Sequence, residues 1–466
     1  MAKPVRVERD SLGTVAVPAS AYYGAQTARA LQNFPISGRR IHRRIVEAYC
    51  HIKRGAAIVN RDVGVLSAAR SRAIVRAADE VLAGRLQDQF VVDVFQAGAG
   101  TSTNMNVNEV LCNRALELLG KKRGDYGALH PNDHVNLGQS TNDTYPTAMR
   151  LAVTVALDEL DLELTALCRA FVVLGNKHAK VVKSGRTHLQ DAVPTTLGLE
   201  LGAYGRAVED SGAALRAAGR GLLSLGIGGT AVGTGMNAHP AFGRLMVREL
   251  RKSTGGRWRQ ARDLVQAMQS QAAIGAVSAA LQTCALEIGR IANDLRLLAS
   301  GPTTGLAEIV LPEVQAGSSI MPGKVNPSIL EMVNMVCFQV VGNHLTVSLA
   351  VGAGQLELNV MMPIMAEKVI ESVELLAAAC RQLRERAVVG IEADVLRCAD
   401  YAHRSLGLAT ALAPAIGYAA AAKIAKQARA EGKTIPEVVR AQRVLPAAEL
   451  ARLLTAAQMT RPSKRR

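Results

Sequence analysis

Four short segments of this 466-residue chain gather hydroxyl, amide and cationic side chains among glycines and prolines. Most of these groups donate hydrogen bonds, and Arg186, His188 and Lys324 add positive charge. Such a donor set suits a small anion, and a substrate with two carboxylates would use hydroxyls, amides and one or two cations together. These polar segments are GAGTSTNMNVNE (98–109), QSTNDTYPT (139–147), SGRTHLQDAVP (184–194) and GSSIMPGKVNP (317–327).

Three prolines connect the polar segments with expected helix starts. Pro146, Pro194 and Pro327 each stand where a long helical pattern begins, and proline is favoured at the first position of a helix. Free N–H groups and the helix dipole attract anions at that end. The sequence therefore predicts that the polar segments lie at helix N-termini. Ser, Thr, Asn and Asp also serve as plain helix caps, so each segment alone favours capping and only the four together favour a binding site.

Long helices are the elements expected to carry these segments. Apolar residues follow each other at three- and four-residue steps through 259–300, which predicts one continuous helix that only Gln271 interrupts. Small residues fill its other faces and favour close packing, including packing of bundles in an oligomer. Similar patterns cover 146–183, 194–222, 327–352 and 363–388, so the expected fold class is mainly α with a central five-helix bundle.

The sequence predicts three domains. Residues 1–143 would form a mixed but mostly helical domain, 144–395 the bundle, and 396–466 a small helical domain with the basic tail RPSKRR.

The polar N-terminus predicts no signal peptide, and the lack of an uninterrupted apolar run of ~18 residues predicts no membrane span. Seven widely spaced cysteines indicate reduced thiols and a cytoplasmic protein. The net charge of +16 comes without a nucleic-acid-binding motif, so we expect no nucleic-acid partner.

Two further patterns predict little chemistry. GIGGTA (226–231) matches a dinucleotide-binding spacing, but no strand is expected before it. His130 and His134 are four residues apart, but Pro131 and Asn132 argue against a helix that would make them a metal-binding pair. No metal site is predicted.

The polar segments resemble those of the aspartase/fumarase superfamily. GSSIMPGKVNP matches the signature loop of that superfamily almost letter for letter, and the resemblance covers nearly the whole chain. It implies a three-domain, mainly α fold whose long helices form the multi-helix core of a homotetramer. It also implies active sites that are each shared by three subunits.

Within the superfamily, the sequence resembles two kinds of enzyme. VPASAYYGAQTARALQNF, GAGTSTNMN, QSTND and HPNDHVN are similar to aspartases, which are aspartate ammonia-lyases, whereas GGTAVGTGMNAHP, VVGIEAD and IGYAAAAKIAKQARAEGKT are similar to class II fumarases. The differences near the substrate favour elimination of ammonia from L-aspartate to give fumarate, with malate/fumarate hydration as the alternative. Met361, Met362 and Pro363 depart from both patterns. A catalytically silent helical oligomer is a third possibility, but it would have lost polar-segment residues that are present here.

The resemblance also implies roles for individual residues. Ser318 would be the base, on a loop that closes about Gly317, Pro322 and Gly323, and His188 would act with it near the amino group. No cofactor is implied as required, and the sequence does not show whether Mg²⁺ activates. The implied substrate-binding residues are Thr101, Ser140, Thr141 and Ser319 for the β-carboxylate, Thr187, Lys324 and Asn326 for the α-carboxylate, Asn142 for the amino group, and Met321.

Overall fold

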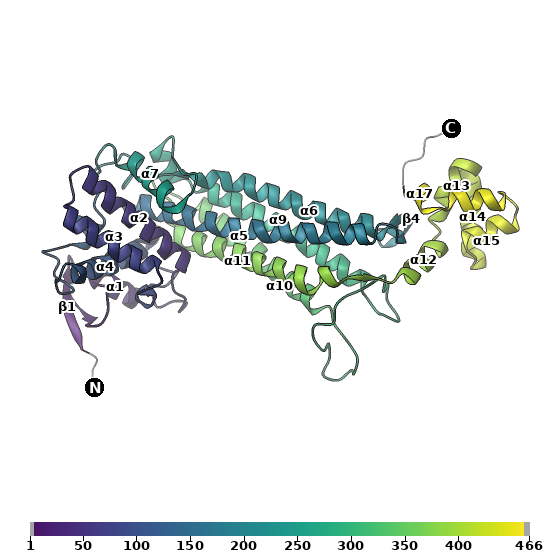
Figure 1. Cartoon of the computed structure of the whole chain (residues 1–466), viewed down its shortest axis with the longest axis horizontal. Helices are drawn as coiled ribbons and strands as arrows, with labels where there is room; N and C mark the ends of the chain where they lie inside the picture. The colour runs from purple at the N-terminus through teal and green to yellow at the C-terminus, as the bar shows by residue number, and fades with distance from the viewer. Residues whose placement is uncertain (1–3, 461–466) are drawn as a thin grey trace. The chain divides into compact units, whose positions relative to one another are not determined.

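Five long helices dominate the computed structural model, which describes residues 4–460 (Figure 1). They confirm the mainly α fold class and lie close to the predicted ranges. The basic tail, residues 461–466, lies outside the described residues. The long helices are α5 (Thr141–Lys177), α6 (Leu197–Gly219), α9 (Ala272–Leu298), α10 (Ser328–Gly352) and α11 (Met362–Arg386).

The chain forms two compact units, and each long helix has part of its length in each of them. The predicted three-domain division stays a prediction. Unit 1 consists of the chain up to Leu160 with Ala213–Thr283 and Gln339–Leu375, and unit 2 consists of Asp161–Gly212, Cys284–Phe338 and the chain from Leu376 onward.

Small residues allow the long helices to approach each other closely. In unit 1, a β-carbon on Gly275 of α9 would meet the side chain of Val351 of α10 at 3.5 Å. In unit 2, a β-carbon on Gly289 of α9 would meet Cys337 Cβ of α10 at the same distance. Because both contacts are at ordinary van der Waals distance, these glycines set a close spacing between α9 and α10.

The prediction of one continuous helix over 259–300 is wrong. Helix α8 (Leu264–Gln269) ends before α9 begins, because Ser270 is extended, with φ −112° and ψ 128°. The Ser270 hydroxyl accepts a hydrogen bond from the backbone N–H of Ala272, which caps α9. Gln271, the only interruption of the apolar pattern, lies buried at this break.

Two of the three expected proline positions are also wrong. Pro146 lies inside α5, because that helix already begins at Thr141. Pro194 lies in a β-hairpin opposite Ser184, so the segment 184–194 forms two strands and no helix N-terminus. Pro327 directly precedes α10, as predicted.

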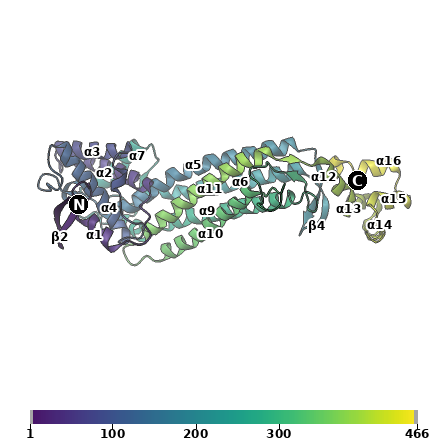
Figure 2. The ribbon, with the colours of Figure 1, turned by 90° about the horizontal axis from the view of Figure 1, so that it is seen from below.

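The rest of unit 1 is mostly short helices and loops. Helix α2 packs against both α3 and α7, and Figures 1 and 2 both show these three helices side by side. The elements are β1 (Val5–Asp10), β2 (Gly13–Pro18), α1 (Ala25–Asn33), α2 (Arg43–Asp62), α3 (Ala68–Leu82), α4 (Thr101–Leu118), a π-helical turn (Pro131–Val135), β5 (Ser224–Leu225), α7 (Phe242–Thr254), β6 (Arg259–Gln260) and α8.

The C-terminal helices of unit 2 share a small apolar core that includes Leu412, Ile424 and Val439. Helix α14 ends at Glu431, because the next residue, Gly432, is left-handed with φ 64° and caps the helix. The remaining elements of unit 2 are β3 (Val182–Thr187), β4 (Gln190–Thr196), β7 (Ile309–Val310), β8 (Glu392–Ala393), α12 (Val395–Arg404), α13 (Leu408–Ile416), α14 (Tyr418–Glu431), α15 (Ile435–Ala441), α16 (Ala447–Leu453) and α17 (Ala456–Met459).

Helices α9 and α10 are long and apolar enough to cross a membrane, judged by length and composition alone. The sequence expectation of no candidate span is therefore not confirmed. Within the single chain, 44% of the apolar window of α9 and 28% of that of α10 are buried.

Candidate active site

The first polar segment presents Thr101 at the N-terminus of α4. Ala99 and Gly100 both have positive φ, 61° and 82°, and turn the chain sharply into the helix. A β-carbon on Gly100 would come 2.0 Å from the ring of Tyr145, so only glycine fits there. Thr101 is exposed, and among residues 4–460 its hydroxyl donates a hydrogen bond only to the carbonyl of Gly98, at 3.4 Å. Its hydroxyl is therefore available to an anion beside free helix N–H groups.

The second polar segment forms the first turn of α5, as predicted. Ser140 precedes the helix and its hydroxyl accepts from the N–H of Asn142. Asp143 is fully buried beneath this turn and accepts from the N–H groups of Ser140, Gly228 and Thr230 at 2.9–3.0 Å. Burial raises the pKa of Asp143 to about 6, against these hydrogen bonds.

Asp143 also accounts for the loop 226–231, whose glycine spacing resembles that of a dinucleotide-binding loop. A short strand, β5, does precede Gly226, so the expectation of no strand was wrong. No phosphate is needed to explain the loop, however, because the N–H groups of Gly228 and Thr230 donate to the Asp143 carboxylate. The Asn142 side chain donates to the carbonyl of Ala231, 2.8 Å away. Through these hydrogen bonds to Asp143 and Asn142, the loop holds the first turn of α5 in place.

Lys53 joins the first two polar segments and was not predicted from the sequence. Its ammonium donates to Asn104 Oδ1 and Asn136 Oδ1 at 2.8 Å and to Gln139 Oε1 at 3.0 Å. Asn104 lies in the first turn of α4, and Gln139 directly precedes Ser140. The side chain is fully buried, and burial lowers the pKa of Lys53 to about 7. The sequence did contain a signal for this buried lysine: Lys53 follows Tyr49 by four residues and so lies on the apolar side of α2.

The third polar segment is a β-hairpin whose two-residue tip is His188–Leu189. Both tip residues have positive φ, 53° and 59°, and Thr187 pairs with Gln190 across the turn. Such a turn favours Gly, Asn or Asp, so two other residues here indicate a strained tip. His188 is exposed in the single chain, so its imidazole is not a buried part of the core of unit 2.

Buried charges hold this hairpin in place within unit 2. The Lys183 ammonium lies 2.7 Å from the Glu200 carboxylate and 2.9 Å from that of Glu308, which is fully buried. Arg186 donates from Nη1 to both Glu308 carboxylate oxygens at 2.9 Å. Arg186 therefore anchors the hairpin, and Thr187 and His188 are the groups that the hairpin presents.

The fourth polar segment is a loop between α9 and α10 that projects from these helices (Figure 1). The Ser318 hydroxyl accepts from the N–H groups of Ile320 and Met321 at 3.2 and 3.0 Å. Two such donors favour a negatively charged oxygen, as a serine base requires. Ser319, Met321 and Lys324 are exposed.

Backbone contacts close the base of this loop. The N–H of Gly317 donates to the carbonyl of Lys324 at 2.8 Å, and Asn326 Nδ2 donates to the carbonyl of Gly317 at 2.6 Å. A β-carbon on Gly317 would meet the N–H nitrogen of Asn326 at 2.5 Å. Gly317 is therefore held tightly in this conformation, whereas Gly323, with φ 80°, has open space around it.

The predicted site residues fall into two groups. Thr101, Ser140, Thr141 and Asn142 belong to unit 1, where Lys53 links their segments. The others belong to unit 2, where no hydrogen bond among the described residues joins the hairpin tip to the loop 317–327. His130 precedes a π-helical turn, Pro131–Val135, that contains His134 and that the sequence did not predict. Within residues 4–460 no cluster of three or more metal-ligating side chains occurs.

Comparison with known proteins gives the family. Residues 13–342 match the family described as Lyase, and residues 408–461 match Fumarase C C-terminus. Aspartate ammonia-lyases of Bacillus sp and Pseudomonas aeruginosa are 45% and 47% identical, over 98% of this chain and 98% and 97% of theirs. A class II fumarate hydratase of Thermosynechococcus vestitus is 46% identical over 94% of both chains.

Solved structures agree with this result. A "fumarate lyase:delta crystallin" of Brucella melitensis, bound to cobalt, has a TM-score of 0.96 and 47% identity, covering 98% of this chain and all of that one. A class II fumarase of Schistosoma mansoni has a TM-score of 0.95 and 37% identity, covering 98% and 99%. This chain therefore belongs to the lyase family of enzymes that makes up the aspartase/fumarase superfamily.

Proposed function

We propose that this enzyme is an aspartate ammonia-lyase, which eliminates ammonia from L-aspartate to give fumarate. Overall identity does not decide between the two activities, because aspartase and fumarase relatives are equally similar. The residues at the substrate-binding segments carry the proposal. Ser102 stands in α4 where fumarases tend to have glutamine, and Thr141 stands in α5 where they have serine.

The proposed base is Ser318. A C–H beside a carboxylate is a very weak acid, so its removal needs a positioned base and strong stabilisation of the charge that develops. The N–H groups of Ile320 and Met321 already point at the Ser318 oxygen and would stabilise its alkoxide. Closure of the loop about Gly323 would bring this oxygen to the substrate and exclude water.

Hydroxyl groups would stabilise the doubly negative aci-carboxylate intermediate. We assign the β-carboxylate to Thr101, Ser140, Thr141 and Ser319. Thr101 and Thr141 are the first residues of α4 and α5, so helix N–H groups assist their hydroxyls. This assignment places the developing charge at two helix N-termini that Lys53 holds together.

The remaining groups would hold the other end of the substrate. We assign the α-carboxylate to Thr187, Lys324 and Asn326, and the amino group to Asn142 and His188. Lys324 and His188 are exposed within one chain and available to a ligand, and Met321 would line the site. An ammonium can leave as neutral ammonia without an added proton, so His188 need not act as a general acid.

We also propose a homotetramer in which three subunits build each active site. The predicted site residues are divided between two units of one chain, and α10 exposes an apolar stripe. Met335, Phe338, Leu345 and Leu349 are 64–69% exposed at helical spacing, and such a stripe needs a partner. Seven unpaired cysteines support a reducing, cytoplasmic location.

An ultraviolet assay for fumarate, run with L-aspartate and L-malate side by side, tests the proposed activity. We expect turnover of aspartate alone. Turnover of malate but not aspartate would establish the alternative, class II fumarate hydratase, which the match of residues 408–461 to Fumarase C C-terminus favours. Turnover of neither substrate would support a catalytically silent oligomer.

A further inference from the structure

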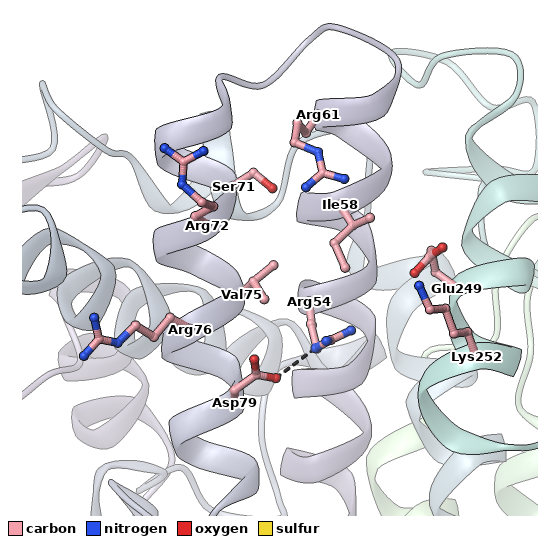
Figure 3. Close-up of a pocket in the computed structure, with 10 residues that line it drawn as sticks. All are labelled: Arg54, Ile58, Arg61, Ser71, Arg72, Val75, Arg76, Asp79, Glu249 and Lys252. Carbon is pink, nitrogen blue, oxygen red and sulfur yellow. Dashed lines mark hydrogen bonds and ion pairs between the residues drawn. The ribbon is translucent and has the colours of Figure 1, made fainter.

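Three charged side chains meet at the hairpin of unit 2: Lys183, Arg186 and Glu308. They differ from exposed ion pairs such as that of Arg54 with Asp79 on α2 and α3 of unit 1, which Figure 3 shows. The Asp79 side chain is 51% exposed, and a pair of that kind contributes little to stability. Glu308 is fully buried, where an unpaired carboxylate is costly. Its two cations are therefore held more firmly than those of a surface pair.

Backbone hydrogen bonds fix Glu308 from two sides. Its N–H donates to the carbonyl of Leu298, the last residue of α9, at 2.9 Å, and its carbonyl accepts from the N–H of Asp394 at 3.0 Å. Directly after Glu308, β7 pairs with β8, with Ile309 opposite Ala393. The carboxylate therefore projects from a rigid support, and a change of the side chain leaves these backbone bonds in place.

The hairpin tip depends on Arg186 for its position. Within residues 4–460, Arg186 is the last residue before the tip whose side chain has a hydrogen bond or ion pair, and both of its hydrogen bonds go to Glu308 at 2.9 Å. Thr187 and His188 follow directly, and both are exposed. His188 and Leu189 have positive φ angles, which are unfavourable for these residue types, so the turn needs support from its surroundings.

Lys183 balances the buried charge and has a second acid of its own. Its ammonium lies 2.9 Å from the Glu308 carboxylate and 2.7 Å from that of Glu200 on α6. Among the described residues, Glu200 pairs with Lys183 and not with Arg186. Glu200 therefore supports the part of the hairpin that is distant from the tip, and Glu308 is the carboxylate that holds the cation beside the tip.

We propose that Glu308 is a positioning residue for the reaction: through Arg186 it holds the hairpin tip in the orientation that presents Thr187 and His188 to the substrate. This inference rests on the proposed lyase activity, which assigns Thr187 to the α-carboxylate and His188 to the amino group. Hydrogen bonds between a guanidinium group and a carboxylate are strong, so they restrict where Arg186 can lie. A displacement of about 1 Å at a substrate contact can lower the rate about a hundredfold. Glu308 itself would not touch the substrate.

Glu308→Gln in the full-length enzyme tests this role, because glutamine keeps the shape of the side chain and removes its charge. Since the tip residues are assigned to substrate binding, KM for L-aspartate should rise about tenfold, as for the loss of one charge-assisted hydrogen bond, and kcat should change less. Arg186→Met removes the same ion pair from its other side and should raise KM similarly. It leaves Glu308 paired with Lys183, so the buried carboxylate stays compensated, and this variant carries the test if Glu308→Gln does not fold.

Glu200→Gln is the matched control. It removes a carboxylate from Lys183, as Glu308→Gln does, but it leaves the contact between Glu308 and Arg186 intact. Because Glu200 is partly exposed and distant from the tip, KM should stay within about twofold of wild type. Denaturant unfolding of each variant measures how far its stability has changed.

A double-mutant cycle distinguishes positioning of the tip from a general effect on folding. The tip variant combines Thr187→Ala with His188→Ala and so removes the groups through which Glu308 would act. Adding Glu308→Gln to the tip variant should change kcat/KM by less than about twofold, because effects that act through the same groups are not additive. A merely structural role of Glu308 would lower kcat/KM by the same factor in both backgrounds. This ratio can be measured below saturation, even where KM is high.

Three results would overturn the proposal. These are a wild-type KM in Glu308→Gln and Arg186→Met, an equal rise of KM in Glu200→Gln, and an undiminished effect of Glu308→Gln in the tip variant. The proposed lyase activity fails separately, if the wild-type enzyme does not turn over L-aspartate. Should it turn over L-malate instead, the same series with L-malate tests Glu308, and turnover of neither substrate would overturn both proposals.

Discussion

Gly100 and Tyr145 lie so close together that a β-carbon on Gly100 would come within 2.0 Å of the tyrosine ring. Tyr145 is fully buried in α5, and Gly100 immediately precedes Thr101 of α4. The starts of α4 and α5, which carry two of the polar segments, are therefore packed against each other without space for any side chain between them.

Gly100→Ala should consequently displace the start of α4 and with it the Thr101 hydroxyl. We expect a loss of about 2–4 kcal/mol in the free energy of unfolding, from overpacking and from a positive φ, together with a strong loss of turnover. Gly120→Ala is the control, since Gly120 also has positive φ, 71°, but no atom within 4 Å of a β-carbon. Denaturant unfolding measures the loss of free energy of unfolding in both variants. Equal losses would show that the contact with Tyr145 does not contribute to it.

Lys53 predicts an unusual pH dependence of stability. Burial lowers its pKa to about 7 in the folded chain, from an ordinary value of 10.5. Between these two pKa values the unfolded chain binds more protons, so Lys53 makes the free energy of unfolding rise with pH by up to about 1.4 kcal/mol per unit. Lys53→Met should remove this rise between about pH 7 and pH 10, as measured by denaturant unfolding.

The same variant should lower activity as well as change stability. Without the ammonium, the oxygens of Asn104, Asn136 and Gln139 lose a shared donor, and the segments that carry Thr101 and Ser140 are no longer tied together. Lys53→Arg keeps the charge, but the larger guanidinium group would not fit the buried site, so this variant should not restore activity. A methionine variant with the wild-type pH profile and wild-type KM would contradict this role.

Ser318→Ala tests the proposed base. We expect turnover to fall by about 10²–10⁴, as for the loss of a general base, while binding of fumarate is retained. Ser319→Ala is the matched control on the next residue and should lower kcat less than Ser318→Ala does, since Ser319 is assigned to stabilising the charge on the β-carboxylate and not to removing the proton. Near-normal turnover by the Ser318 variant would remove this residue from the role of base.

The apolar stripe of α10 predicts the assembly state. Phe338→Glu with Leu345→Glu should dissociate the enzyme and abolish activity, because the stripe would otherwise be buried between subunits. Leu12→Glu places the same kind of charge on a similarly exposed leucine of unit 1 and should leave the assembly intact. Light scattering and the fumarate assay report both effects, and an active monomer would contradict the shared site.

The sequence predicted the long helices well, because apolar periodicity is a local signal. It failed where a distant contact decides the local structure. The segment 184–194 forms strands that are anchored by Glu308, more than a hundred residues away, and no local pattern reveals that pairing. The break at Ser270 was visible only as one polar residue, Gln271, in an otherwise regular stripe.

The site residues divide in the same way. Thr101 and Thr141 begin α4 and α5, as expected for polar segments placed at helix N-termini, whereas their binding roles come from the resemblance and stay predictions. Lys53 was not found, because its significance depends on three amide oxygens from other segments. Sequence alone also could not show that the amides of Ile320 and Met321 point at Ser318.

The positive φ angles at the hairpin tip have a consequence for engineering. Leu189→Gly would relieve a strained backbone and should stabilise the folded chain by about 1 kcal/mol. The same change would let His188 sample many more orientations. Selection for heat tolerance would therefore favour glycine at position 189, whereas selection for fast turnover would favour leucine, which restricts His188.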